Sequence, residues 1–234
     1  MPNRLQHVLK HLHNLANPEV VERKAKKFGI PKTNSLGLTM EQIKLIAKEL
    51  GKDSKLAVEL IETEIYEARL LASKIFNKED LTSELMDEWV QFFDTWEICD
   101  AFCMEIFKYS DLSYDKIFEW THSKEEFVKR AGYVIMATYG QGHKEAPNEI
   151  YDACFPLVLR DACDDRNFVK KAVNWALRQI GKRNRDLQKR CIELCHELLH
   201  LDDKTANWIA RNALRELENP KTKIRRYPQS VYGI

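Results

Sequence analysis

Hydrophobic residues recur at helical spacing along most of this chain. The segment after Thr39 shows the pattern, because its apolar residues fall three or four positions apart on one helix face, at Ile43, Ile46, Ala47 and Leu50. Thr39 and Gln42 form a capping-box pair that begins this helix, and Gly51 ends it. The same spacing predicts a helix from Asp53 or Ser54 through Ile61, and further helices over 66–76, 84–93, 96–107, 114–120, 125–139, 148–162, 168–180, 187–201 and 205–217.

Most of these predicted helices form pairs separated by a short turn. Only 8 of 234 residues are glycine, and no long alternation of Val, Ile or Thr indicates a strand. The sequence therefore predicts an all-α chain of stacked helical hairpins.

An internal repeat supports this architecture. Residues 126–131 and 167–172 share Phe-Val-Lys-basic-Ala, and a polar residue followed by Ala recurs with Ala68, Ala101, Ala131 and Ala172. A degenerate copy follows within 209–215. These alanines recur at intervals of 33, 30 and 41 residues. A repeat of this length is typical of stacked helix pairs, in which Ala packs where two helices come close. The preceding residues are Glu67, Asp100, Arg130 and Lys171, and stacking in register predicts that they line one surface.

The length and apolar content suit one continuous helical domain over residues 1–218. The basic residues and two prolines of 219–234 predict an extended or disordered tail. We expect a cytoplasmic protein, because no apolar stretch is long enough for a signal peptide or a membrane span. We also expect a monomer.

Positive charge is concentrated in the second half of the chain. The formal net charge is +1, but residues 120–234 hold 21 Lys and Arg against 15 Asp and Glu, and residues 1–119 hold 16 against 21. Residues 166–190 alone carry nine basic side chains and one acid, Asp186, with Phe168 and Trp175 among them. This segment favours a polyanionic partner such as nucleic acid, and the alternative is a solvated helix face.

The pattern His-Glu-x-x-His occurs once, from His196 to His200, and Cys191 and Cys195 lie just before it. In zinc hydrolases the two histidines bind the metal and the Glu is the general base. Because no third ligand or substrate-binding strand is evident here, we interpret the match as coincidental and expect no metal. The six cysteines have no disulfide-framework spacing, so we expect reduced thiols in the helical core.

Three motifs in a fixed order carry a family resemblance. Residues 94–100 contain Trp-x-x-x-Asp at Trp96 and Asp100, residues 126–131 end in Arg130 and Ala131, and residues 167–178 place Phe168 seven positions before Trp175. Over about residues 17–217 the chain resembles the DNA alkylation repair family, the bacterial alkylpurine DNA glycosylases of HEAT-like repeat fold (AlkD type). The resemblance implies a C-shaped helical solenoid with a basic concave face that holds duplex DNA, without a cofactor.

The resemblance also implies roles for individual residues. Asp100 would stabilise the oxocarbenium ion and orient water, while Trp96 and Trp175 would pack against the sugar and the cationic base. Arg130 would bind a flanking phosphate, and Phe168 would form a wall of the DNA-binding face. The basic residues expected to contact DNA beside them are Lys170, Lys171, Arg178, Lys182 and Arg183. The alternatives are core positions for Trp96 and Trp175 and an ion pair between Arg130 and Asp100.

One segment departs from the family pattern. In active relatives an N-terminal helix rich in aromatic and basic residues closes over the DNA, but residues 28–37 contain Pro31, two glycines and a Thr-Asn-Ser cluster. These residues oppose a helix, so we expect a loop there. Two functions follow: hydrolytic removal of cationic alkylated purines, or binding of nucleic acid or a partner by a scaffold without glycosylase activity.

Overall fold

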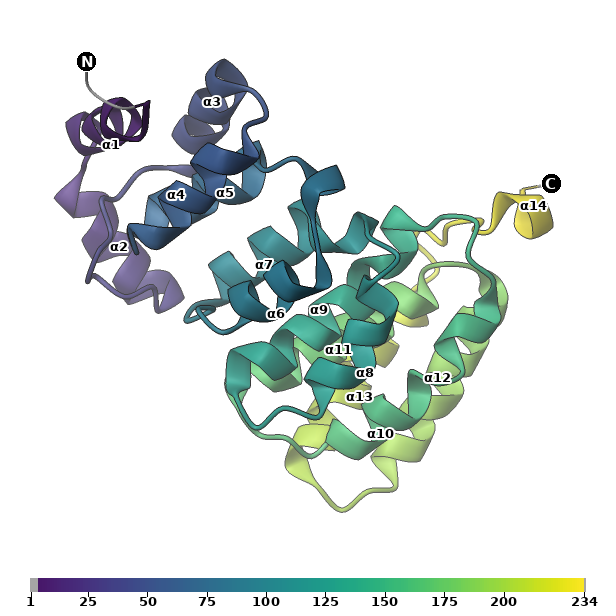
Figure 1. Cartoon of the computed structure of the whole chain (residues 1–234). Helices are drawn as coiled ribbons and strands as arrows, with labels where there is room; N and C mark the ends of the chain where they lie inside the picture. Colours follow the sequence, from purple (N-terminus) through teal and green to yellow (C-terminus); the bar gives the residue numbers. More distant parts are fainter. Residues whose placement is uncertain (1–3, 234) are drawn as a thin grey trace. The chain divides into compact units, whose positions relative to one another are not determined.

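The computed structural model describes residues 4–233, which form two compact units, Met1–Phe107 and Lys108–Ile234. No strand occurs in that range, so the all-α prediction is confirmed (Figure 1). The single domain expected over residues 1–218 stays a prediction, and each unit is described by itself.

Unit 1 is built around α5, against which α3, α4 and α7 pack. Its helices are α1 (Arg4–Asn14), α2 (Pro18–Phe28), α3 (Met40–Leu50), α4 (Ser54–Glu62), α5 (Tyr66–Ile75), α6 (Ser83–Val90) and α7 (Trp96–Glu105), with a 3-10 turn at Lys78–Asp80. Thr39 and Gln42 form the predicted capping box of α3, and Gly51 ends that helix with a φ of 71°. Asp53 caps α4 by accepting a hydrogen bond from the Leu56 N–H.

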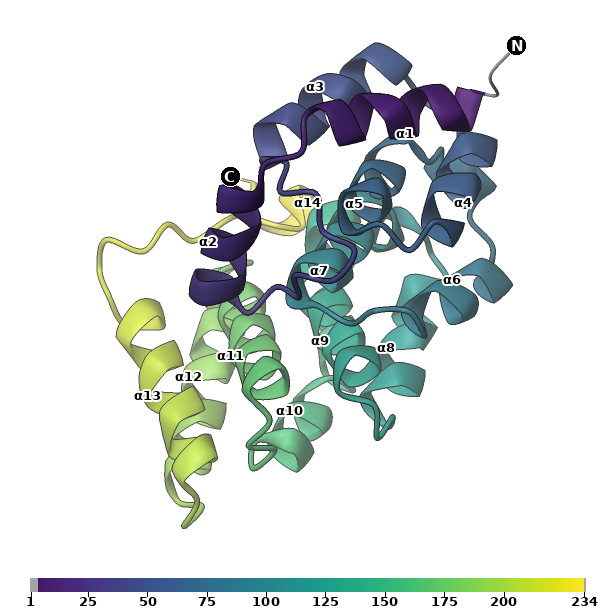
Figure 2. The ribbon, with the colours of Figure 1, turned by 90° about the vertical axis from the view of Figure 1, so that its left-hand side faces the viewer.

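Unit 2 is a stack of helix pairs. Its helices are α8 (Ser113–Thr121), α9 (Glu126–Gly142), α10 (Phe155–Asp161), α11 (Asn167–Gly181), α12 (Arg185–Leu199), α13 (Lys204–Leu217) and α14 (Gln229–Tyr232), with 3-10 turns at Phe107–Tyr109 and Asn148–Tyr151. α11 packs against α9 on one side and α13 on the other, and the three lie side by side in Figure 2. The repeat alanines Ala131 and Ala172 are fully buried, as predicted for residues at close helix contacts.

The prediction differs from the structure at several helices. The helix predicted over 148–162 is a 3-10 turn followed by the short α10, because Pro156 has no N–H to donate and fits only the first turn of a helix. Helices α1 and α2 were not predicted. Only Val8 and Leu12 are buried in α1, and only Val20 in α2, so neither carries a long apolar stripe.

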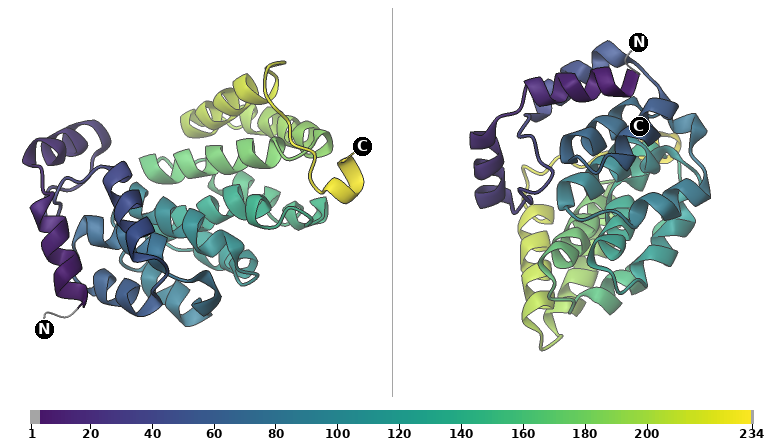
Figure 3. Two further views of the ribbon diagram at one scale, coloured as in Figure 1. Left: turned by 90° about the horizontal axis from the view of Figure 1, so that it is seen from above. Right: turned by 60° about the vertical axis from the view of Figure 1, so that its left-hand side comes forward.

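The segment from Asn219 to Pro228 is not helical and lies against unit 2. The Arg225 N–H donates to the Lys182 carbonyl at 2.8 Å, and the Tyr227 N–H donates to the Arg183 carbonyl at 3.2 Å. The short α14 follows, near the C-terminus in Figure 3. The sequence predicts an extended or disordered tail, but not this helix.

A non-helical loop joins α2 to α3, as predicted for residues 28–37. It is built around Glu67 of α5, which is 0% exposed. The Glu67 carboxylate accepts hydrogen bonds from Ser35 Oγ (3.1 Å) and from the N–H groups of Leu36 (2.7 Å), Gly37 (2.8 Å) and Leu38 (3.3 Å). The loop is therefore an ordered part of unit 1.

Gly37 tests how tightly this loop is packed. Its φ is +82°, and a Cβ at this position would lie 2.1 Å from the Asn17 carbonyl oxygen. Gly37→Ala should lower the free energy of unfolding by about 3 kcal/mol through backbone strain and this clash. Gly29→Ala is the control, since φ is +69° but nothing lies within 4 Å, and it should lose only about 1 kcal/mol. Equal losses in urea unfolding would contradict the packing described.

Candidate nucleic-acid interface

The residues that the sequence predicts as functional lie in both units. Trp96 and Asp100 belong to α7 of unit 1, and the remaining candidates belong to α9, α11 and the α11–α12 turn of unit 2.

Trp96 is the first residue of α7, which Thr95 caps by accepting a hydrogen bond from the Ile98 N–H. The Trp96 Nε1–H donates to the Phe28 carbonyl at 3.1 Å, and the two rings meet edge to face at 6.3 Å. This contact ties the start of α7 to the end of α2. Trp96 is half-buried, whereas Trp89, a core residue, is 1% exposed, so Trp96 keeps an accessible surface.

Asp100 lies one turn after Trp96 on the same helix and is also half-buried. Glu67 holds the equivalent repeat position on α5, the neighbouring helix, but is fully buried under the α2–α3 loop. The prediction that both line one surface is therefore wrong for Glu67. The Glu67 carboxylate stabilises the fold by accepting hydrogen bonds from backbone N–H groups, while the Asp100 carboxylate lies nearer the surface of unit 1.

Unit 1 also contains a cavity of about 360 Å³, which the sequence did not indicate. The loop residues Pro31, Thr33 and Asn34 line it together with Arg69 and Asp94. The Arg69 guanidinium lies 4.8 Å from the Phe92 ring centre and 3.8 Å from the Asp94 carboxylate. Arg69, whose charge Asp94 partly neutralises, therefore lies at this cavity close to the start of α7.

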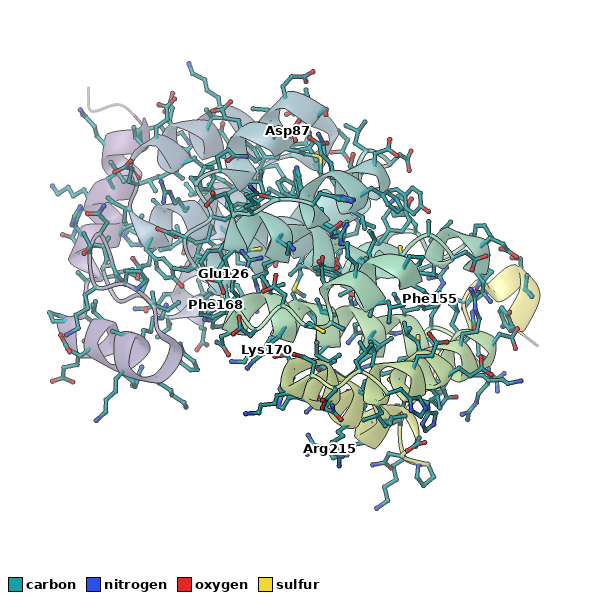
Figure 4. The ribbon with its side chains drawn as sticks, turned by 90° about the horizontal axis from the view of Figure 1, so that it is seen from below. Asp87, Glu126, Phe155, Phe168, Lys170 and Arg215 are labelled. Carbon is teal, nitrogen blue, oxygen red and sulfur yellow. The ribbon has the colours of Figure 1, made fainter. Side chains whose placement is uncertain are left out.

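Arg130 of α9 is buried at 6% exposure, and its Nη1–H donates to the Phe168 carbonyl at 2.8 Å. Glu126 and Phe168 lie close together in Figure 4. The Phe168 N–H donates to Glu126 at 3.1 Å, and the Phe168 ring lies 5.2 Å from that of Phe127. Such burial contradicts the predicted role of Arg130 at an open phosphate-binding surface. Arg130 instead holds the beginning of α11 against α9 and thereby positions Phe168.

The basic residues of α11 differ in how available they are. Lys171 is exposed, whereas Lys170 is half-buried with its Nζ 5.5 Å from the ring centre of Trp208 on α13. Trp175 is half-buried on the same helix. This part of α11 thus presents cations and one aromatic ring at the surface of unit 2.

Arg178 and Lys182 share one acidic partner. Each donates to Glu216 of α13 at 2.5 Å. Desolvation raises the pKa of Glu216, but hydrogen bonds from Lys182 and Arg178 outweigh it, so the pKa is lowered overall. Glu216 is therefore ionised at neutral pH and offsets one of the two positive charges.

Arg183 was predicted to contact DNA, and this prediction is wrong because the residue is 2% exposed. Its guanidinium donates to the carbonyls of Gly140 (2.7 Å), His143 (3.2 Å), Lys144 (2.8 Å) and Ala146 (2.6 Å). These bonds satisfy carbonyl groups in the last turn of α9 and just after it, which have no partner within the helix. Arg183 is a structural residue.

Sequence reasoning missed Trp208. It is 40% exposed on α13, next to Lys170, and is the one exposed tryptophan among the five of the chain, all of which the structure describes. The sequence does contain a signal for it: like Trp175, Trp208 has Lys and Arg residues at helical spacing on either side.

The His-Glu-x-x-His match forms no metal centre in the structure. His196, Glu197 and His200 are exposed at the end of α12, while Cys191 and Cys195 are buried, which raises the pKa of the Cys195 thiol to about 12. Within residues 4–233, no group of three or more His, Cys, Asp or Glu side chains could hold a metal ion. None of the helices in that range has the length and apolar character needed to cross a membrane.

The arrangement of unit 2, helix pairs with α9, α11 and α13 as neighbours, is that of a HEAT-like repeat protein. Residues 8–217 match the family described as DNA alkylation repair enzyme, so the chain belongs to that family. No curated protein matches the chain.

One solved structure shares the fold. It is described as a new family of proteins related to the HEAT-like repeat DNA glycosylases with affinity for branched DNA structures. It has 18% identity and a TM-score of 0.74, covering 95% of this chain and 98% of its own. The HEAT-like prediction is confirmed by this likeness.

Two engineered proteins are less similar. Both are 15% identical and cover 93% of this chain, with 99% and 97% of their own chains covered and TM-scores of 0.43 and 0.41. These scores are too low to indicate a shared fold.

The structural role of Arg183 has a measurable consequence. Arg183→Ala removes the guanidinium donor from four carbonyl groups at the end of α9 and should lower the free energy of unfolding by about 3 kcal/mol. Arg185→Ala is the matched control, because Arg185 is exposed and donates only to Gln188, and it should change stability by less than about 0.5 kcal/mol. Equal urea midpoints for the two variants would contradict this structural role of Arg183.

Proposed function

We propose that this chain binds duplex DNA through the exposed basic residues of unit 2 and hydrolyses the N-glycosidic bond of cationic alkylated purines. Family membership supports a role in the repair of alkylated DNA. The structural relative described as having affinity for branched DNA supports the DNA-binding part of the proposal.

The DNA-binding part rests on which cations are available. Lys171 is exposed, Lys170 reaches Trp208, and Arg211 and Arg215 on α13 are exposed beside them. Among the described residues none of Lys171, Arg211 and Arg215 has an ion-pair partner, so their charge is free to meet phosphates. Arg178 and Lys182 contribute less, because Glu216 offsets part of their charge.

The catalytic part rests on the contrast between Glu67 and Asp100. The two carboxylates hold equivalent repeat positions, but Glu67 is fully buried under the α2–α3 loop, while Asp100 is half-buried one turn from Trp96. A carboxylate that keeps some exposure can face a developing positive charge, whereas a fully buried one cannot. This contrast is the observation that carries the proposed activity.

The proposed reaction is the cleavage of an already weakened bond. A purine alkylated at ring nitrogen three or seven is cationic, and its departure leaves positive charge on the sugar. Asp100 would stabilise this oxocarbenium ion and orient the water that attacks it. Trp96, held by its bond to the Phe28 carbonyl, would present a ring to the sugar. Trp175 on unit 2 is proposed to contact the cationic base in the same way.

The second candidate function is DNA binding without base release. Two observations favour it: a loop stands where active relatives have a helix, and Arg130 is buried at 6% exposure. Both weaken the hold on a damaged nucleotide without affecting the exposed cations of α11 and α13. Release of methylated purines from treated duplex DNA by the wild-type protein separates the two functions.

Asp100→Asn tests the catalytic assignment. Base release from methylated duplex DNA should fall at least about a hundredfold, which corresponds to about 3 kcal/mol of lost electrostatic stabilisation. DNA affinity should stay level or rise, because one negative charge is removed.

Glu105→Gln is the matched control for this variant, since Glu105 is an exposed carboxylate on the same helix and pairs with Lys74. It should keep full activity. A stable Asp100→Asn variant with wild-type base release would remove Asp100 from the mechanism. A wild-type protein that binds DNA but releases no base would favour the second function.

The DNA-binding surface is tested by reversing one charge. Lys171→Glu should weaken binding to blunt duplex DNA by about tenfold at low salt and reduce the slope of log K against log salt by about 1. Lys189→Glu makes the same change on an exposed lysine of α12 and should have a small effect. Equal weakening in fluorescence anisotropy titrations would mean that overall charge, and not this surface, determines binding.

A further inference from the structure

The surface pattern of α11 is repeated on α13. Four residues of α11 and the residue that follows it recur 33 positions later with the same spacing and nearly the same chemistry. They are Lys171, Asn174, Trp175 and Arg178 on α11 with Lys182 just after it, and Lys204, Asn207, Trp208, Arg211 and Arg215 on α13. Of the second set, only Arg211 and Arg215 have a role in the proposed function, as cations that meet phosphates.

The two asparagines explain part of this repetition through the fold. The Asn174 side chain donates to the Ile209 carbonyl at 3.0 Å and so ties α11 to α13. The Asn207 side chain donates to the carbonyls of Leu201 (3.2 Å) and Asp203 (2.8 Å), which fixes the turn before α13. Arg178 and Lys182 likewise tie the end of α11 to α13 through Glu216. The two tryptophans and the cations of α13 have no structural explanation of this kind.

These residues share one face of each helix. Positions separated by four, seven and eleven residues lie along one side of an α-helix, as Lys204, Trp208, Arg211 and Arg215 do. The buried side of α13 is lined instead by Ala206, Ile209, Ala210, Ala213 and Leu214. In Figure 4 Arg215 points away from the ribbon of unit 2. The α13 set is exposed except for the half-buried Asn207, whereas in the α11 set only Lys171 is exposed. The pattern is therefore most open to solvent on α13.

The chemistry of the α13 face fits a polyanion with an exposed ring. No Asp or Glu occurs from Lys204 to Arg215, so nothing on this stretch of helix offsets its cations. Trp208 is 40% exposed, and the Lys170 Nζ lies 5.5 Å from its ring centre. An exposed indole among cations is the combination that binds single-stranded nucleic acid, because bases stack on the ring and phosphates pair with the cations. A protein partner without a strong negative charge would leave these cations unpaired.

We infer that Trp208, with Lys204, Arg211 and Arg215, binds an unpaired nucleotide next to duplex DNA. The bases of a duplex stack on one another and offer no free face to a side chain, whereas an unpaired base at an overhang or a branch does. The base would stack on Trp208 and its flanking phosphates would pair with the three cations. This inference rests on the proposed DNA binding by unit 2, but not on base release.

The test compares two DNAs that differ only in a single-stranded extension. The full chain is titrated by fluorescence anisotropy with a blunt duplex and with the same duplex carrying a short overhang. Wild-type protein should prefer the overhang by about tenfold, the factor expected from one stacked base. Trp208→Ala should abolish this preference and change affinity for the blunt duplex by less than about twofold. Trp208→Phe should keep most of the preference.

Leu159→Ala is the control, because Leu159 is an exposed apolar residue of α10 in the same unit, and it should keep the full preference. A preference that persists in Trp208→Ala overturns the inference, as does a wild-type protein that binds both DNAs equally. If the wild-type protein binds neither DNA, the proposed function fails as well, so the two failures are distinguishable. Self-association of the wild-type chain that Trp208→Ala abolishes, together with equal DNA binding, would assign this face to a second copy and also overturn the inference.

Discussion

Each unit depends on one buried charged side chain that satisfies backbone groups where a helix gives way to a loop. Such N–H and C=O groups lack helical partners, and burying them unpaired is costly. In unit 1 the Glu67 carboxylate accepts hydrogen bonds from the α2–α3 loop, and in unit 2 the Arg183 guanidinium donates to one carbonyl in the last turn of α9 and to three after it. Both residues look like surface charges in the sequence, yet both are almost fully buried. The loops that they hold are therefore as well defined as the helices.

Local signals in the sequence were enough to predict most helices. The Thr39–Gln42 capping box, the stop at Gly51 and the burial of the repeat alanines Ala68, Ala131 and Ala172 all appear in the structure, whereas the fourth, Ala101, is half-buried. The prediction is wrong where the apolar pattern is weak or interrupted: α1 and α2 bury too few residues to show a clear stripe, and Pro156 divides the helix predicted over 148–162. The loop was predicted over residues 28–37 from its glycines and Pro31, but its organisation around a glutamate 29 or more residues away depends on tertiary contacts.

Candidate site residues were harder to predict, because charge and spacing do not reveal burial. Lys171 and Arg183 lie in the same basic segment, but one is exposed and the other is enclosed by backbone carbonyls. Glu67 and Asp100 share a repeat position, but Glu67 is fully buried and Asp100 is half-buried. Arg178 and Lys182 are partly neutralised by Glu216, which is more than 30 residues away in sequence. Contacts between residues far apart in the sequence thus decide which charged residues stabilise the HEAT-like scaffold and which remain exposed to a partner.

The account depends most on the claim that the α11 and α13 face of unit 2 is where DNA binds. Lysine-specific chemical labelling of the full chain, read out by mass spectrometry with and without blunt duplex DNA, tests this claim directly. We predict that DNA protects Lys171 and Lys204 and leaves Lys189 of α12 and Lys55 of α4, both exposed, at their unbound labelling rates. Protection of Lys189 or Lys55 with unchanged labelling of Lys171 and Lys204 would contradict the account.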